Sequence, residues 1–294
     1  ASSTAKILIT GGSVKATNVR ATPIDGTGAE LYLVKIINLN DINSVVADNT
    51  ITYNRKGNHP DNDGAFYLYI TGRDHTITFD DTTIPVKWSG EKQKLFIQNY
   101  DYIASDLKIS SEGNDLNAIY DADGQTHYIW GEGNYVIVGN GQETQEKVFV
   151  AEDFKGTITI KDINSPRMNV ANTAQLTLML EGTNTLRQGL RFENATTGTL
   201  TIDSNTNGSL TATSSWPGAG IGGGDNTSGN NITINGGTIS AKGNQGAGIG
   251  GGSFDGAANN ITINGGTVIA IGSQTNFGSG CNAARIERCN GDSS

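Results

Sequence analysis

The sequence predicts an all-β protein in which small antiparallel, sandwich-like modules precede a right-handed parallel β-helix. The first observation is a repeat of about 29 residues. Gly218-Ala-Gly-Ile-Gly-Gly-Gly224 and Ile232-Thr-Ile-Asn-Gly-Gly-Thr-Ile239 return as Gly246-Ala-Gly-Ile-Gly-Gly-Gly252 and Ile261-Thr-Ile-Asn-Gly-Gly-Thr-Val268. The second is that no segment between these motifs has helical spacing. Self-similarity at a fixed period indicates stacked structural repeats.

Each repeat contains three short strands and two corners. Ile232-Thr-Ile alternates apolar and polar residues, which is the period of a β-strand. Asn235-Gly-Gly237 predicts a corner, because Asn and Gly tolerate positive φ. Thr238–Ala241 is the second strand, and Gly-Ala-Gly-Ile is the third. Stacking such coils buries one apolar side chain at each equivalent position, which stabilises by roughly 1.5–3 kcal/mol per side chain.

Weaker copies of the Ile-Thr-Ile triplet continue upstream. The alignment that we expect has the central residues Ile137, Thr159, Thr177, Thr201, Thr233 and Thr262. It predicts two inward columns of stacked side chains. One contains Ile158, Leu176, Leu200, Ile232 and Ile261, and the other contains Leu210, Ile239 and Val268.

The chain is predicted to have four parts. Residues 1–28 hold a partial coil and a polar linker, 29–140 hold β-rich modules, 141–281 form the parallel β-helix, and 282–294 form a C-terminal tail. The partial coil, Ile7 to Ala16, either ends an upstream repeat block or adds to an open end of the stack. We favour the upstream block, because a polar stretch follows.

Two copies of an Asp-x-Asp-Gly motif define the middle part. They begin at Asp61 and Asp121, 60 residues apart, and an aromatic-rich strand follows each. Asp side chains bond the backbone of a turn, and Gly accepts positive φ. We therefore expect one or two hairpin-centred modules, the second merging with the β-helix near Tyr135 and protecting its edge.

Composition excludes several classes of partner. The chain has 294 residues, 40 of them Gly, and a net charge of −9, which argues against nucleic acids and anionic membrane surfaces. No run is long and apolar enough for a transmembrane helix. The Gly218-Ala-Gly-Ile-Gly-Gly223 match to a dinucleotide fingerprint lacks the helix that must follow.

The two repeated motifs resemble those of large surface proteins from gut and environmental anaerobic bacteria. Those proteins are grouped as carbohydrate-binding-domain-like or adhesin-like right-handed parallel β-helices. The resemblance covers residues 155–271 well. It implies an extracellular or cell-surface location and glycan binding, sometimes with calcium, and it carries over no catalytic residue.

Candidate binding residues lie in the loops of the repeats. Trp216, Phe254 and Phe277 can stack on sugar rings, or they can be buried beneath loops. Asp225 and Asp255 occupy matching loops and can supply two oxygen ligands to calcium, the only cofactor that we keep open.

Two further pairings are expected near the coils. Cys281 and Cys289 can form a disulfide or remain thiols. Stacked amide ladders are expected at two sets of equivalent corners, namely Asn231 with Asn260, and Asp203 with Asn235 and Asn264.

Catalysis has few candidate groups. A polysaccharide lyase or glycoside hydrolase would have to use Arg187, Arg191, Glu193, Asp162 or Asp203. The three histidines, His59, His75 and His127, are too scattered to indicate a zinc site or a catalytic triad.

We therefore expect a non-catalytic, extracellular, adhesin-like protein that binds a polysaccharide or a host or cell-surface glycan. End-to-end or tandem-repeat self-association is a second expected mode of contact. The alternatives are a polysaccharide lyase or glycoside hydrolase on a pectate-lyase-like fold, and a structural stalk.

Overall fold

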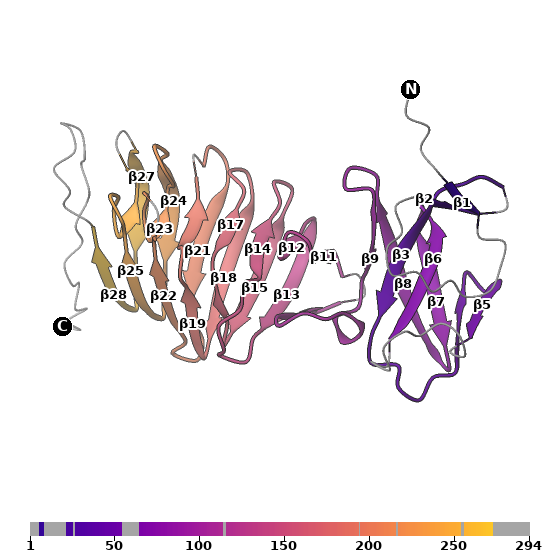
Figure 1. Cartoon of the computed structure of the whole chain (residues 1–294). Coiled ribbons are helices and arrows are strands. Elements are labelled where there is room, and N and C mark those ends of the chain that lie inside the picture. Colours follow the sequence, from indigo (N-terminus) through magenta and orange to yellow (C-terminus); the bar gives the residue numbers. More distant parts are fainter. Residues whose placement is uncertain are drawn as a thin grey trace, which may run out of the picture. The chain divides into compact units, whose positions relative to one another are not determined.

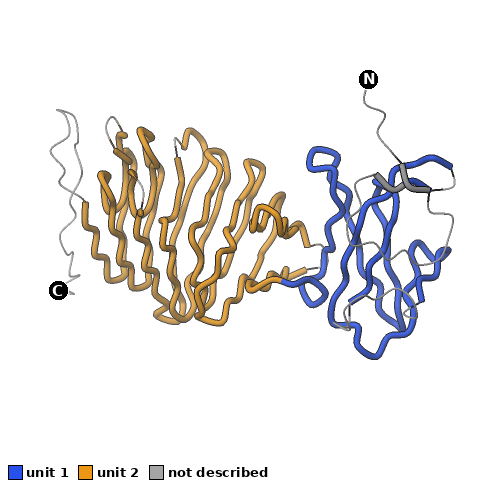
Figure 2. The backbone as a smooth tube through the Cα atoms, in the orientation of Figure 1, with its two compact units in different colours: residues 1–104 blue, residues 105–294 orange. Residues whose placement is uncertain are grey.

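A computed structural model describes residues 6–8, 22–25, 27–54, 65–113, 116–193, 195–215, 217–253 and 256–272. The chain forms two compact units, residues 1–104 and residues 105–294 (Figure 2). Trp216, Phe254, Asp255, Phe277, Cys281 and Cys289 lie outside the described residues, so the predictions for them stay predictions.

The second unit is a parallel β-helix with three sheets (Figure 1). Sheet 1 has the order β10 (Lys108–Ser111), β13 (Glu132–Val138), β15 (Lys155–Lys161), β18 (Gln175–Glu181), β21 (Thr199–Asp203), β24 (Gly229–Ile234) and β27 (Ala258–Ile263). Sheet 2 has the order β11 (Ala118–Asp121), β12 (Thr126–Ile129), β14 (Lys147–Val150), β17 (Met168–Val170), β20 (Leu190–Phe192), β23 (Ile221–Gly222) and β26 (Ile249–Gly250). Sheet 3 has the order β16 (Asn164–Ser165), β19 (Thr183–Leu186), β22 (Ser209–Thr213), β25 (Thr238–Lys242) and β28 (Thr267–Ile271).

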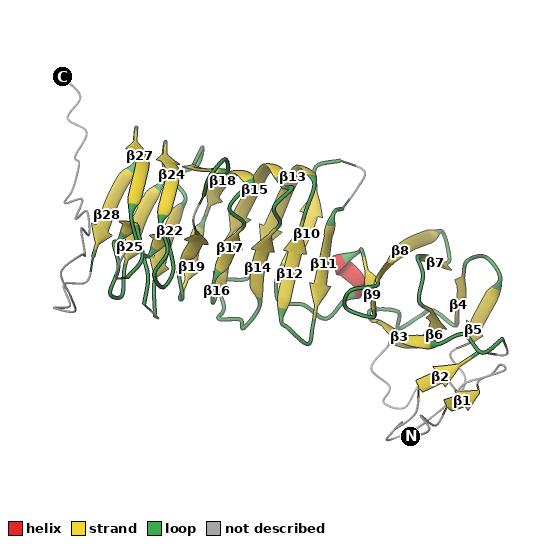
Figure 3. Ribbon diagram, turned by 90° about the horizontal axis from the view of Figure 1, so that it is seen from above, coloured by secondary structure: helices red, strands yellow, loops and turns green. Residues whose placement is uncertain are grey.

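Equivalent strands of successive coils lie side by side and run parallel (Figure 3). Ile234 pairs with Ile263 in sheet 1, as the repeat predicts. The second predicted column is also confirmed, since Leu210, Ile239 and Val268 are in register in sheet 3. The buried side chain of Asn184 extends that column by one coil.

The predicted alignment is wrong at Ile158. That residue pairs with Leu178, whereas Leu176 pairs with Gly156. Thr157, not Thr159, is therefore level with Thr177. A shift of one residue would exchange the inward and outward faces, but a shift of two preserves both. The alternation of the sequence therefore determines the faces of a strand without determining its register.

The alignment predicts that Ile137, as the central residue of its triplet, points outward, and this is wrong. Ile137 is fully buried, whereas Val138 is 37% exposed. Ile137 pairs with Ile160, so it belongs to the apolar interior.

The sequence predicts that the β-helix starts at residue 141, but in the structure it starts earlier. β12 already pairs in parallel with β14, and β13 pairs in parallel with β15. The Asp-x-Asp-Gly turn that begins at Asp121 joins β11 and β12 as an antiparallel hairpin in sheet 2. This second motif is consequently part of the first coil. The antiparallel strands β10 and β11 occupy the ends of their sheets, where they cover the edges of β13 and β12.

The first unit contains the predicted antiparallel sandwich. A two-stranded sheet faces a five-stranded sheet across one apolar core that includes Val34, Leu68 and Ile84. The described helix η1 (Tyr100–Tyr102) follows the last strand. The sheets are β3 (Leu31–Ile36) with β6 (Phe66–Thr71), and β5 (Ile51–Asn54), β4 (Ser44–Ala47), β7 (His75–Phe79), β8 (Thr82–Ser89) and β9 (Lys94–Ile97) in spatial order.

The N-terminal stretch differs from the predicted linker. β1 (Lys6–Leu8) pairs in parallel with β2 (Thr22–Ile24), so part of this stretch is a strand. Within the described residues, no helix has the length and apolar character needed to span a membrane.

Candidate functional site

The outward face of sheet 2 changes from aromatic to charged along the stack. Its inward column consists of buried side chains, from His127 through Val148 and Met168 to Ile249. Because side chains alternate along a strand, the neighbouring positions face solvent. The outward column runs in register through Tyr128, Phe149, Asn169, Arg191, Gly222 and Gly250.

A cavity of about 590 Å³ lies on this face, and we call it the sheet 2 groove. Its charged residues come from four successive coils. The lining residues are Phe149, Glu152, Arg167, Asn169, Val170, Ala171, Asn172, Gln188, Arg191, Glu193, Pro217, Gly224 and Asp225.

Arg191 is fixed in the wall of the groove. The residue is only 8% exposed, its Nη1 donates to the carbonyl of Gly223 at 3.0 Å, and its Nη2 donates to Oγ of Ser214 at 3.1 Å. Burial lowers the pKa of Arg191, and the positive charge of Arg167 lowers it further. The negative charges of Glu193 and Asp225 act in the opposite direction. The groove thus brings charges of both signs within electrostatic range.

Glycines of the first Gly-rich motif leave room for these side chains. A Cβ at Gly218 would overlap Nη1 of Arg191, and a Cβ at Gly224 would overlap Oε1 of Glu193. The corresponding glycines of the second motif, Gly246 and Gly252, approach backbone atoms of the preceding coil instead. The first motif therefore shapes a site as well as a coil, which the repeat alone did not reveal.

Charged groups in the groove are not fully paired with one another. Nε of Arg167 is buried, and it has no hydrogen-bond partner in the described part of the chain. The ion pairs of the described coils involve other residues, such as Lys161 with Glu181 and Arg187 with Glu143. Arg167 lines the cavity, so this unsatisfied donor lies in the wall of the groove.

Asp225 is an exposed member of the groove, and its Oδ1 accepts a hydrogen bond of 2.6 Å from Oγ of Ser253. The described residues contain no group of three or more His, Cys, Asp or Glu side chains that could hold a metal ion. Pairing of Asp225 with Asp255 around calcium remains a prediction. Pro217, the neighbour of Trp216, lines the groove.

The structure separates the residues that were considered for catalysis. Arg191 and Glu193 lie in the groove. Arg187 instead donates to the carbonyl of Asn164 at 2.8 Å, and Asp162 accepts a 2.9 Å hydrogen bond from the amide of Thr183. Asp162 therefore holds the corner between sheets 1 and 3, and Arg187 binds strand β16 of the preceding coil.

Sequence reasoning missed the aromatic residues of the groove. Tyr128 and Phe149 are both half-buried, with ring centroids 5.7 Å apart and planes tilted by 54°. The available signal was their alternation with the apolar residues Ile129, Val148 and Val150. That alternation assigns them to the face opposite the core.

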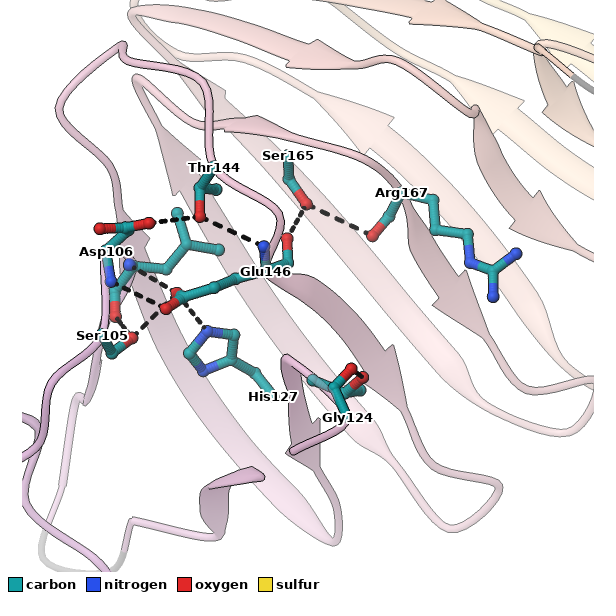
Figure 4. A network of polar contacts seen from close by, with 10 residues as sticks. Ser105, Asp106, Gly124, His127, Thr144, Glu146, Ser165 and Arg167 are labelled. Carbon is teal, nitrogen blue, oxygen red and sulfur yellow. Dashed lines mark hydrogen bonds and ion pairs between the residues drawn. The ribbon is translucent and has the colours of Figure 1, made fainter. Parts of the chain in front are cut away.

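A second polar cluster surrounds the buried carboxylate of Glu146 (Figure 4). Its Oε2 accepts hydrogen bonds of 3.0 Å from Oγ of Ser105 and from the amide of Leu107, and its Oε1 accepts one of 3.0 Å from the amide of Asp106. Nε2 of His127 lies 2.9 Å from Oε2. These contacts attach the segment that begins the second unit to the first coil.

The Glu146 cluster is an anchor rather than an active site. Burial acts to raise the pKa of Glu146, but the hydrogen bonds from His127, Leu107 and Asp106 lower it to about 2. His127 is fully buried, and the carboxylate of Glu146 lies between it and Ser105. This arrangement does not place a base on a nucleophile.

Asn ladders join the last described coils, as predicted. Nδ2 of Asn260 donates to Oδ1 of Asn231 at 3.0 Å, and Nδ2 of Asn264 donates to Oδ1 of Asn235 at 2.9 Å. The carboxylate of Asp203 caps its own corner by accepting from the amide of Ser204 at 2.7 Å. These polar residues stabilise corners.

A family model described as Beta helix repeat matches residues 206–225, 232–253 and 261–283. The matched segments contain the repeated motifs, and the parallel sheets agree with the description. Neither the curated proteins nor the solved structures gave a match.

Proposed function

We propose that the protein is a non-catalytic, adhesin-like saccharide-binding protein of the extracellular space or cell surface, and that the sheet 2 groove holds the sugar. The observation that carries this proposal is the cavity itself, which brings Arg167, Glu193 and Asp225 together on the outward face of sheet 2. The resemblance of the Gly-rich repeats to bacterial surface proteins supports the location. A polysaccharide or a host or cell-surface glycan is the partner that follows.

Sugar hydroxyls suit this groove because each can both donate and accept a hydrogen bond. The guanidinium of Arg167 donates, the carboxylates of Glu193 and Asp225 accept, and the amide of Asn169 does both. A ligand that carried only negative charge would meet both carboxylates. The net charge of −9 adds to that repulsion.

A polysaccharide lyase is the second candidate, because burial lowers the pKa of Arg191 beside two carboxylates. A lowered pKa is what a basic side chain needs to accept a proton. Against this role, Nη1 and Nη2 of Arg191 already donate to Gly223 and Ser214. Binding without turnover therefore fits the geometry better.

A glycan microarray, run with and without calcium, tests the proposal. The glycans that bind are then incubated with the protein and examined for released or unsaturated products. Binding without products supports the proposal, products support the lyase or hydrolase, and the absence of binding supports a structural stalk.

A matched pair of variants locates the site. Arg167→Ala removes a cation that lines the groove and is expected to weaken binding tenfold or more, the value of a charged hydrogen bond. Lys161→Ala removes an exposed cation on sheet 1 and should leave the affinity unchanged. Equal affinities for the two variants would place the site elsewhere.

A further inference from the structure

Aromatic side chains lie at one end of the groove. Phe149 lines the cavity and contacts Tyr128 of the preceding coil. Both residues are half-buried, so part of each side chain is accessible. An aromatic ring at a solvent-facing site offers a flat apolar surface for a ligand.

Trp130 adds a third ring to this end. It follows Tyr128 by two positions and is half-buried, and its amide donates to the carbonyl of Asn117 at 3.1 Å, which continues the hairpin. Because that pairing continues one residue beyond the end of β12, alternation places Trp130 on the same side as Tyr128. Its indole N–H adds a hydrogen-bond donor to the apolar surface.

Small residues follow Trp130 along the stack. Ile129 pairs with Val150, Val150 with Val170, and Val170 with Phe192. Trp130, Ala151, Ala171 and Glu193 each follow the last residue of their strand by one position. Ala151 and Ala171 have small side chains, which leave space above them for a ligand. Ala171 lines the cavity.

We propose that Tyr128, Trp130 and Phe149 form a ring-stacking subsite, and that the ligand is an oligosaccharide lying along the stack from this subsite to Arg191 and Glu193. This inference rests on the proposed function and names its ligand class. A pyranose ring whose hydroxyls are equatorial presents axial C–H groups on both of its faces, which suits stacking on an aromatic ring. We therefore expect the oligosaccharide to contain equatorially substituted pyranose units where it contacts Tyr128, Trp130 and Phe149.

The length of the site requires several sugar rings. Three inter-strand steps separate Tyr128 from Arg191, which is roughly 14 Å at the usual spacing between neighbouring strands. A single ring cannot touch both ends. A short saccharide can either stack on the aromatic rings or form hydrogen bonds with the charged groups. A longer oligosaccharide can do both at once.

Titration calorimetry of the full chain with a length series of β-linked gluco-oligosaccharides, from one to six rings, tests this inference. Affinity is expected to rise with length and to reach a plateau once both ends are reached. Phe149→Ala and Trp130→Ala should weaken binding of the longest member about three- to tenfold, the value of one aromatic contact. Met179→Ala, which shortens an outward side chain on sheet 1, is the matched control.

Phe149→Leu guards against loss of folding, because it keeps an apolar side chain and removes only the ring. Weaker binding at an unchanged thermal midpoint supports the stacking subsite. If the length series binds and neither aromatic variant weakens it, the subsite is wrong and the proposed function stands. If the wild-type protein binds neither this series nor any glycan of the array, both the stacking subsite and the proposed function are wrong.

Discussion

Gly218 and Arg191 are in direct contact, so closely that a Cβ on the glycine would overlap Nη1 of the arginine. Gly218→Ala should therefore displace the guanidinium from Gly223 and Ser214. We expect saccharide binding to weaken at least tenfold and stability to fall by roughly 1–3 kcal/mol, because buried donors lose their partners. Calorimetry and urea unfolding measure the two effects.

The strain of the backbone needs its own control in that experiment. Gly113 has φ +159°, close to the +151° of Gly218, but no atom of the described part of the chain lies within 4 Å of the place that a Cβ would take. Gly113→Ala should keep full affinity. A similar loss of affinity in both variants would attribute the effect to the backbone and not to Arg191.

The anchor at Glu146 predicts a dependence of stability on pH. The pKa of Glu146 is lowered to about 2 from the ordinary value of 4.5. A carboxyl group whose pKa is lowered by folding stabilises the protein above its unfolded pKa. That contribution is lost as pH falls from about 4.5 towards 2. Urea unfolding at pH 7 and at pH 3 should show a larger decrease for the wild type than for Glu146→Gln.

At neutral pH, Glu146→Gln should itself destabilise the protein. The new amide group places donors against the amides of Asp106 and Leu107, which already donate to this position. A mismatch of buried donors costs roughly 1–3 kcal/mol. Unchanged stability at pH 7 would show that the anchor does not hold the first coil.

The Asn ladder predicts a position-specific cost at Asn231. This residue has φ 54°, donates to the carbonyl of Gly198 at 3.2 Å, and accepts from Asn260. Asn231→Ala loses both bonds and strains the backbone, so we expect a loss of about 2 kcal/mol in urea unfolding. Thr233→Ala, on the same strand, should change stability by less than about 0.5 kcal/mol. If Asn231→Ala and Thr233→Ala lower the free energy of unfolding by similar amounts, the Asn ladder does not contribute a specific stabilisation.

Calcium should be dispensable for binding in the groove. The saccharide contacts that we propose, those of Arg167, Asn169 and Glu193, need no metal ion. Chelation with EDTA is therefore expected to leave the affinity unchanged. A rise of the midpoint on addition of calcium, abolished in Asp225→Asn, would instead assign a metal to the loop of Asp225.

Local sequence patterns predicted the coil because apolar alternation marks the inward side of each strand. The same patterns misplaced Ile158 by two residues, since Gly156 offers no side chain by which to recognise its level in the stack. The handedness of the coil remains a prediction from fold analogy. The Asn ladder was predictable because both copies carry Asn at the same corner.

The site was harder to predict, because outward positions need no repeating residue type. Tyr128, Phe149, Asn169 and Arg191 form one column in which the residue type changes from aromatic to amide to cation. Only the register of the folded strands brings them together. The role of Gly218 was equally hidden, because its sequence context matches that of Gly246, which contacts backbone.

The most direct measurement is a crystal structure of the wild-type protein soaked with the longest oligosaccharide that binds in calorimetry. The account predicts sugar density on the outward face of sheet 2, with one ring over Phe149 and hydroxyls within hydrogen-bond distance of Arg167 and Glu193. Density on sheet 1 or sheet 3, or an empty groove at saturating ligand, would contradict it.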